Sequence, residues 1–82
     1  MAIRIDRWLW AARFFKTRAL AQAAIRGGHV QLNGVRVKPS RELKVGDSLS
    51  ITRGVERFDV EVLGLSEKRG PAKVAAELYA ED

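Results

Sequence analysis

The sequence of 82 residues has no cysteine and only one histidine, and no apolar run approaches the roughly 18 residues that a membrane-spanning helix needs. Because cysteine is absent, neither a disulfide framework nor a thiolate metal site is available. Motifs for a phosphate-binding loop, a dinucleotide site or a zinc hydrolase are also missing. A chain this short has little volume for a substrate pocket. We therefore expect a non-catalytic protein with no cofactor, no metal site, no small-molecule substrate and no membrane span.

Acidic residues are scarce in the first half of the chain, and this makes the charge uneven. Asp6 is the only acid in the first 41 residues. Residues 1–53 contain eleven basic and three acidic residues, a net charge of +8, whereas residues 54–82 contain four basic and seven acidic residues, a net charge of −3. The carboxylate of Asp6 also stands where a signal peptide would have its apolar stretch, which favours a cytoplasmic protein. We expect the first two thirds to bind an anionic partner and the last third to act as scaffold.

The spacing of apolar residues predicts two helices in the first third of the chain. Apolar residues recur at helical spacing over residues 5–15, and the Ala-rich segment Arg18–Arg26 has high helix propensity. Thr17 can cap the second helix through its hydroxyl, and Gly27-Gly28 can end it. The residues of the second helix available for the core are Leu20, Ala21, Ala24 and Ile25.

Alternating residues predict an antiparallel sheet after these helices. Asn33-Gly34 separates the alternating segments 29–32 and 35–38, the pattern of a two-residue hairpin in which Leu32 faces Val35. Two further strands are predicted at 48–52 and 58–62, and a last helix begins at Pro71. The apolar stripe of that helix consists of Val74, Ala75, Leu78 and Tyr79. The predicted fold is α+β: two N-terminal helices packed on a small, mostly antiparallel sheet with a short C-terminal helix, in one domain of residues 1–82.

Basic residues at helical spacing form the candidate binding site. Arg18, Gln22 and Arg26 lie at i, i+4 and i+8 on one face of the second predicted helix. The N-terminal end of this helix, where free backbone N–H groups favour a phosphate, carries Lys16 and Thr17. Arginine binds phosphate bidentately; the alternative interpretation is a solvated helix face. Further basic residues of the same region are Arg4, Arg13, Lys38 and Arg41.

The first predicted helix is crowded with aromatic residues and holds the lone acid. Trp8 falls on the apolar stripe and belongs to the core. Trp10 and Phe14 either pack beneath the later strands, which we favour, or lie exposed as stacking platforms for bases. Asp6 either orients Arg13 at i+7 or satisfies backbone donors at the helix start.

Two polar residues beside the hairpin have structural and functional interpretations. His29 follows the Gly-Gly corner, and a structural hydrogen bond is favoured for it over a contact with RNA. Asn33 is needed for the turn itself, since both central residues of this turn type require a positive φ. Any ligand contact by Asn33 is secondary to that role.

Three short motifs resemble those of a known RNA-binding family. Arg4-Ile5-Asp6 opens the first predicted helix, Lys16-Thr17-Arg18 opens the second, and the corner from Gly28 to Asn33-Gly34 follows at the family's spacing. In this combination the chain resembles the RNA-binding domain named after small-subunit ribosomal protein four. The segments 37–40, 46–47, 68–72 and 78–79 are similar to the bacterial heat-shock protein fifteen family within it. The resemblance covers nearly the whole chain and implies two helices packed on a small, mostly antiparallel sheet.

The resemblance implies binding of structured RNA, ribosomal or transfer RNA, through a motif at about residues 3–48 that residues 49–82 support. For the heat-shock family it implies recognition of free large ribosomal subunits that still carry a peptidyl-tRNA, so that they can be recycled. That family typically continues past the last helix into a long basic tail, whereas this sequence stops at Glu81-Asp82, so the resemblance does not carry over the affinity or specificity that the tail supplies. The contact residues carried over by position are Arg4, Arg13, Lys16, Thr17, Arg18, Gln22, Arg26, Asn33, Lys38 and Arg41.

Two other functions fit the same sequence features. One is a basic protein–protein adaptor with Trp10 and Phe14 as exposed anchors. The other is a detached recognition module that acts together with an RNA-modifying enzyme. Binding to DNA is compatible with the same basic surface, and we expect the chain to be a monomer.

Overall fold

The computed structural model describes residues 2–81, which form an α+β fold as predicted. The helices are α1 (Ile5–Ala11), α2 (Arg18–Arg26), α3 (Ala72–Ala75) and the single-turn 3-10 helix η1 (Ala76–Leu78). The strands are β1 (Ile3–Arg4), β2 (Val30–Leu32), β3 (Val35–Arg36), β4 (Glu42–Leu43), β5 (Ser48–Arg53), β6 (Glu56–Val62) and β7 (Tyr79–Glu81). None of the helices between residues 2 and 81 has the length and apolar content needed to cross a bilayer.

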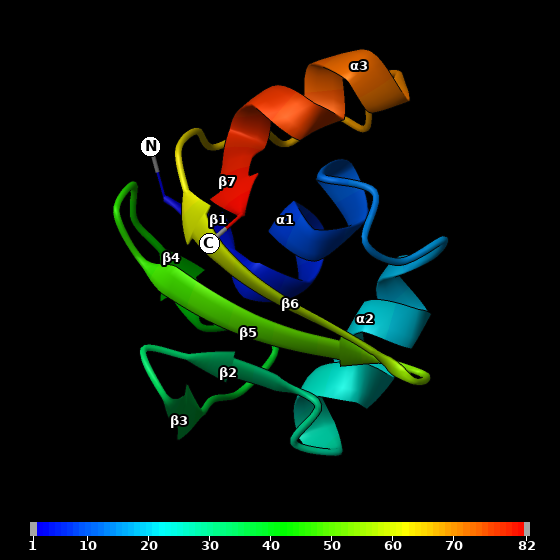
Figure 1. Cartoon of the computed structure of the whole chain (residues 1–82), viewed down its shortest axis with the longest axis vertical. Coiled ribbons are helices and arrows are strands. Elements are labelled where there is room, and N and C mark those ends of the chain that lie inside the picture. Colours follow the sequence, from blue (N-terminus) through cyan, green and yellow to red (C-terminus); the bar gives the residue numbers. More distant parts are fainter. Residues whose placement is uncertain (1, 82) are drawn as a thin grey trace.

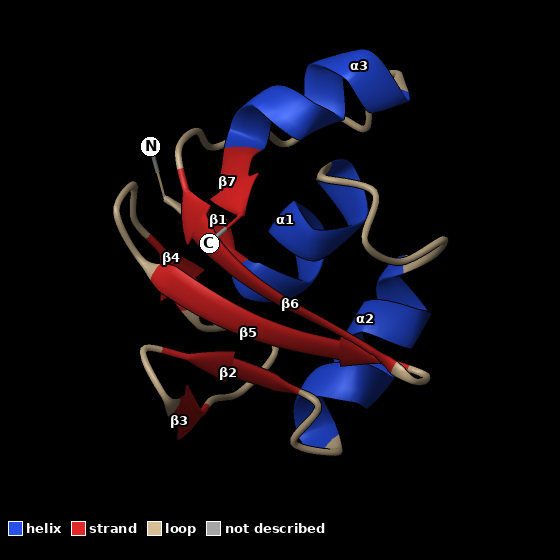
Figure 2. Cartoon of the chain, in the orientation of Figure 1, coloured by secondary structure: helices blue, strands red, loops and turns tan. Residues whose placement is uncertain are grey.

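The strands form two antiparallel sheets, one of five strands in the order β3-β2-β5-β6-β7 and one of two, β1-β4. Figure 1 shows α1 and α2 beside the long β5–β6 ribbon, with α3 at the opposite end of the molecule from the β2–β3 hairpin. The same view coloured by secondary structure separates the helical layer from the sheet (Figure 2). Pairing of Ile3 with Leu43 ties the start of the chain to the segment that follows the hairpin.

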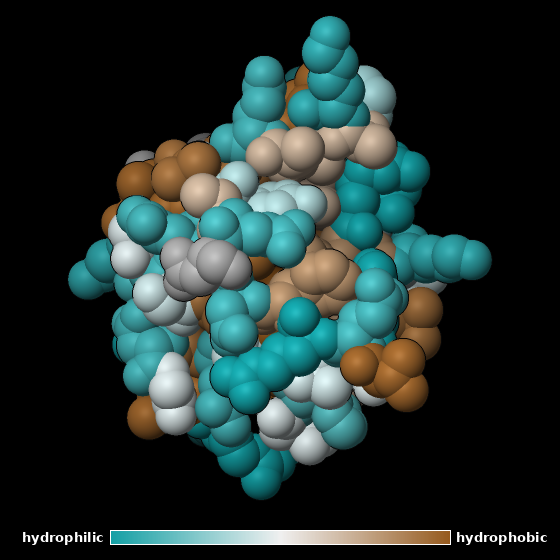
Figure 3. All heavy atoms as spheres, in the orientation of Figure 1, coloured by the Kyte–Doolittle hydropathy of each residue, from teal (hydrophilic) through white to brown (hydrophobic). Residues whose placement is uncertain are grey.

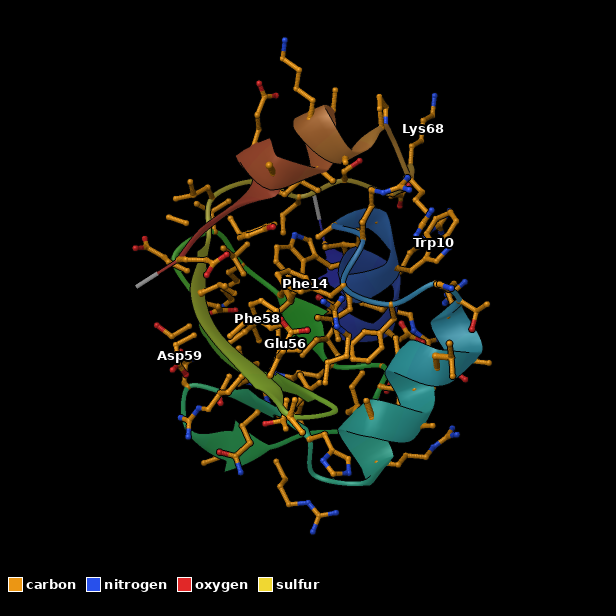
Figure 4. All side chains as sticks on the ribbon, turned by 45° about the vertical axis from the view of Figure 1, so that its right-hand side comes forward. Trp10, Phe14, Glu56, Phe58, Asp59 and Lys68 are labelled. Carbon is orange, nitrogen blue, oxygen red and sulfur yellow. The ribbon has the colours of Figure 1, made fainter. Side chains whose placement is uncertain are left out.

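The core lies between α1 and the inner face of the five-stranded sheet. Trp8 is fully buried as predicted, and its indole Nε1 donates a hydrogen bond of 2.8 Å to the carbonyl oxygen of Gly64. Phe14 is also buried, with its ring centroid 4.7 Å from that of Tyr79 and 5.7 Å from that of Phe58. Figure 4 shows Phe14 and Phe58 together in the interior. The favoured prediction of packing is therefore confirmed for Phe14, which cannot serve as an exposed stacking platform or adaptor anchor. Trp10 is only half-buried and lies at the edge of the molecule, away from Phe58 (Figure 4).

The first helix is shorter than predicted, because it ends at Ala11 and not at residue 15. Arg13 adopts the left-handed conformation with φ of 67°. The N–H of Phe14 then donates to the carbonyl of Leu9 and the N–H of Arg13 to that of Trp10, the two hydrogen bonds of a Schellman motif with arginine where glycine is usual. This reversal turns the ring of Phe14 into the core.

The second helix has the predicted bounds, and its predicted cap is confirmed. The hydroxyl of Thr17 accepts a hydrogen bond of 3.1 Å from the N–H of Leu20. Its core face differs from the prediction: Ala21 and Ile25 are buried, Ala24 is half-buried and Leu20 is 52% exposed. The side chain of Leu20 is thus available on the surface.

The predicted hairpin is confirmed, since φ is 50° at Asn33 and 83° at Gly34 and Leu32 pairs with Val35. The strands predicted at 48–52 and 58–62 are present as β5 and β6. The end of the chain was predicted only in part. The last helix is a single turn of α-helix followed by η1, with Val74 exposed, and Tyr79 begins β7 on the edge of the sheet.

Candidate nucleic-acid interface

Asp6 is the one buried charged residue of the part of the chain that the structure describes. Its Oδ1 accepts hydrogen bonds from the N–H of Arg7 (2.7 Å) and from Nε of Arg4 (3.1 Å). Its Oδ2 accepts from Nη2 of Arg4 (3.0 Å) and from Nε2 of Gln22 (2.8 Å), and Nη2 of Arg18 lies 3.5 Å away. We call these four side chains, Asp6, Arg4, Arg18 and Gln22, the Asp6 cluster.

The partners of Asp6 keep the carboxylate charged. Burial raises the pKa of a carboxyl group because it penalises the charged form. The hydrogen bonds from Gln22 and Arg4 and the positive charges of Arg4 and Arg18 outweigh this effect, so that the pKa of Asp6 lies below its ordinary value of 3.8. The carboxylate of Asp6 is therefore negatively charged at neutral pH and continues to attract Arg4 and Arg18.

The Asp6 cluster corrects two predictions. Asp6 does not orient Arg13, whose Nη1 donates instead to the carbonyl of Gly70 at 3.0 Å. Gln22 and Arg18 do not form a free polar ladder with Arg26, because both turn toward Asp6, whereas Arg26 is exposed and makes no contact with Asp6. The interpretation of Asp6 as a helix-start carboxylate holds through the N–H of Arg7. Its side-chain partners are Arg4, two residues before it in β1, and the longer-range Gln22 and Arg18 of α2.

A basic groove lies beside this cluster at the C-terminal end of α2. The hollow of about 450 Å³ is lined by Arg4, Arg26, Val37, Lys38, Pro39 and Ser40, and we call it the Arg4–Lys38 groove. It brings together three predicted cations from three separate segments, and no acidic side chain lines it. A neighbouring hollow joins Lys38 to the predicted Arg41 and to Arg36. Nη2 of Arg36 donates to the carbonyl of Arg26 at 2.8 Å, which anchors the hairpin to the end of α2.

A second concavity lies at the other end of α2, beside the α1–α2 loop. Its volume is about 570 Å³, and its lining residues are Arg13, Phe14, Phe15, Lys16, Leu20, Arg53 and Arg69. The predicted Arg13 and Lys16 therefore lie apart from the Arg4–Lys38 groove. We call this concavity the loop pocket.

Of three remaining polar residues, two have a structural role and one does not. Thr17 caps α2, and Oδ1 of Asn33 accepts a hydrogen bond of 3.0 Å from the N–H of Ser48, so both side chains stabilise the fold. The imidazole of His29 is exposed and takes part in no hydrogen bond with the residues that the structure describes, so the structural bond predicted for it is wrong. Between residues 2 and 81, no three His, Asp or Glu side chains gather as metal ligands.

Sequence reasoning missed Arg36, Arg53 and Arg69. Arg36 pairs with Gln31 on the basic face of the hairpin, as the alternation of the sequence predicts, but it was not included among the candidate contact residues. Arg53 and Arg69 come from the end of β5 and from the segment before α3, far from the helices in the sequence. No local spacing connects them to the α1–α2 loop.

Replacement of Asp6 by asparagine tests the cluster through its pH dependence. Because the pKa of Asp6 is lowered in the folded protein, its stabilising effect is present above the unfolded pKa and is lost as the pH falls through the folded pKa. We expect Asp6→Asn to lower the free energy of unfolding by about 2 kcal/mol at neutral pH, since the two arginine partners are partly exposed and solvent screens them. Urea unfolding at a series of pH values should show this difference narrowing below about pH 4. A difference that stays constant down to pH 2 would contradict the assignment.

Comparisons with known proteins place this geometry in a family. Heat shock protein 15 of Escherichia coli K12 is 48% identical over 79 residues, which are 96% of this chain and 59% of that protein, so the chain spans about three-fifths of its length. An RQC P-site tRNA stabilizing factor of Listeria monocytogenes is 31% identical, over 94% of this chain and 83% of the factor. A trimeric structure of Vibrio cholerae heat shock protein 15 superposes with a TM-score of 0.97 at 39% identity, over 100% of this chain and 83% of the other.

The matched family covers the two-helix and hairpin region described above. The S4 domain matches residues 3–49, which contain the Asp6 cluster and the Arg4–Lys38 groove. The oligomeric state of this chain stays a prediction. The chain belongs to the S4 domain family and is similar over nearly its whole length to heat shock protein 15.

Proposed function

We propose that this chain binds folded RNA, without catalysis, through the face formed by α1, α2 and the β2–β3 hairpin. The observation that carries the proposal is the Arg4–Lys38 groove, where cations from β1, α2 and the segment after the hairpin line one hollow without an acid among them. Arg4 is held there by the buried carboxylate of Asp6. The motif lies within residues 3–48, and the strands and helix that follow support it.

The chemistry of the groove suits phosphate oxygens more than base edges. Arginine forks bind phosphate bidentately, and each neutralised phosphate releases counterions from the RNA. Side chains cannot enter the deep major groove of A-form RNA, so a rigid set of cations recognises such RNA by shape and backbone contacts. The groove holds two arginines and a lysine, Arg4, Arg26 and Lys38. We infer that it binds the backbone of structured RNA with little dependence on sequence.

The exposed side of β6, which contributes no residue to the groove, carries mixed charge and supplies a control. Figure 3 shows hydrophilic side chains over most of the face viewed, with apolar clusters at its edges and further apolar atoms near its centre. In β6, Nη2 of Arg57 lies 3.3 Å from Oδ1 of Asp59, and both side chains are at least half exposed. Loss of Arg57 changes the net charge as loss of a groove cation does, but at a place where we propose no RNA.

The salt dependence of RNA binding tests the groove. Arg26→Gln and Lys38→Gln should each flatten the slope of log affinity against log salt by about one unit, because each removes one phosphate contact. Neither side chain belongs to the Asp6 cluster, so both variants should keep the stability of the parent. Fluorescence anisotropy with a labelled RNA hairpin at several salt concentrations gives the slopes. Arg57→Gln should leave the slope within about a quarter of a unit; equal changes in all three variants would contradict the assigned face.

The partner that we propose is the ribosome, and within it the free large subunit that carries a peptidyl-tRNA. Two relatives support this proposal by their names, a heat shock protein 15 and an RQC P-site tRNA stabilizing factor. The purified chain should co-sediment with large subunits in preference to small subunits and intact ribosomes at near-physiological salt. Equal binding to all three particles, or binding only at low salt, would contradict recognition of the large subunit and would indicate a domain that binds RNA in general.

A further inference from the structure

The loop pocket combines four cations with an apolar floor. Arg13, Lys16, Arg53 and Arg69 line it together with Phe15 and Leu20. Phe15 is half-buried, and Leu20 is 52% exposed although it belongs to a small domain that needs apolar surface for its core. The three arginines come from the α1–α2 loop, the end of β5 and the segment before α3. These three segments are far apart in the sequence and come together only in the folded chain.

Each arginine of the loop pocket is held in place by a backbone carbonyl. Nη1 of Arg13 donates to Gly70 (3.0 Å), Nε of Arg69 to Trp10 (3.2 Å) and Nη1 of Arg53 to Phe14 (2.8 Å). A guanidinium group has five N–H donors, so each arginine keeps donors that these carbonyls do not use. Side chains fixed in advance lose less conformational entropy when an anion binds.

The positive charge of the loop pocket is poorly balanced. No acidic side chain lines it, and the carbonyl partners are neutral. Glu56 lies 3.7 Å from Arg53, whose guanidinium also sits 5.2 Å from the ring centroid of Phe58. Arg13, Lys16 and Arg69 have no carboxylate within ion-pair distance among the described residues. A ligand that carries both an anionic group and a flat apolar body complements such a pocket.

We propose that the loop pocket binds one unpaired nucleotide of the RNA, with its base against Phe15 and Leu20 and its phosphate among Arg13, Lys16 and Arg69. This inference rests on the proposed RNA binding and adds a second subsite to it. The span of α2 from Arg18 to Arg26 is about 12 Å, so one RNA can reach both the groove and the pocket. Base contact with aromatic and apolar side chains is tolerant of sequence, so the pocket selects an extruded nucleotide by its shape and exposure.

RNA hairpins that differ by one bulged nucleotide test this subsite. The panel consists of one fully paired stem and versions of it with a single adenosine bulged at each position in turn. The parent protein should bind the best bulged hairpin about tenfold more tightly than the paired stem, as measured by fluorescence anisotropy at fixed salt. Leu20→Gln removes apolar surface from the pocket and Arg69→Gln removes charge; each should reduce this preference to about twofold or less while affinity for the paired stem changes little.

Two matched variants separate the pocket from general effects. Val45→Gln changes another exposed apolar residue, 61% exposed in the turn before β5, and Arg57→Gln removes a charge on the outer side of β6. Both should keep the full preference for the bulged hairpin. The proposed nucleotide subsite would be overturned if the parent protein binds all hairpins equally, or if the preference for the bulged hairpin survives both Leu20→Gln and Arg69→Gln. Failure to bind any hairpin would overturn the proposed RNA binding itself.

Discussion

The carboxylate of Asp6 is buried between α1 and α2, and the position of the basic face depends on it. A buried charge without partners is strongly destabilising, so the fold must supply donors to both oxygens. Arg4 supplies them from β1, while Gln22 and Arg18 supply them from α2. The contacts from Gln22 and Arg18 join α1 to α2, which approach each other only in the folded chain. The same bonds hold Arg4 at the edge of the groove where the RNA backbone is proposed to lie.

The α1–α2 loop is fixed by a second set of contacts that is independent of Asp6. The left-handed Arg13 ends α1 and directs Phe14 into the aromatic core. Arg13 then donates to Gly70, and Arg69 donates to Trp10 of α1, so the segment before α3 is held against both the loop and the end of α1. The C-terminal third thus does more than support the sheet, since it contributes a cation to the surface of the N-terminal motif.

Local signals predicted the elements whose geometry they control. The Thr17 cap, the body of α2 and the Asn33-Gly34 turn each depend on residues close in sequence, and each is present as predicted. The end of α1 was missed because arginine at Arg13 takes a conformation more typical of glycine. The strands β1, β4 and β7 are two or three residues long, too short for an alternating pattern, and tertiary pairing defines them. Helical spacing predicted Arg18, Gln22 and Arg26 as contact residues, but it could not show that Asp6 holds the first two or that Arg69 lies beside the α1–α2 loop.

The RNA affinity of Asp6→Asn tests most directly whether this carboxylate organises the basic face. The substitution makes the protein more positive by one charge, so simple attraction to RNA would tighten binding. If the affinity for RNA depends more on the fixed positions of Arg4, Arg18 and Gln22 than on net charge, the folded variant should bind an RNA hairpin about fivefold more weakly than the parent at neutral pH. Asp59→Asn changes the charge equally on the exposed side of β6 and should not weaken binding. An Asp6→Asn variant that is folded and binds as tightly as the parent, or more tightly, would contradict this account.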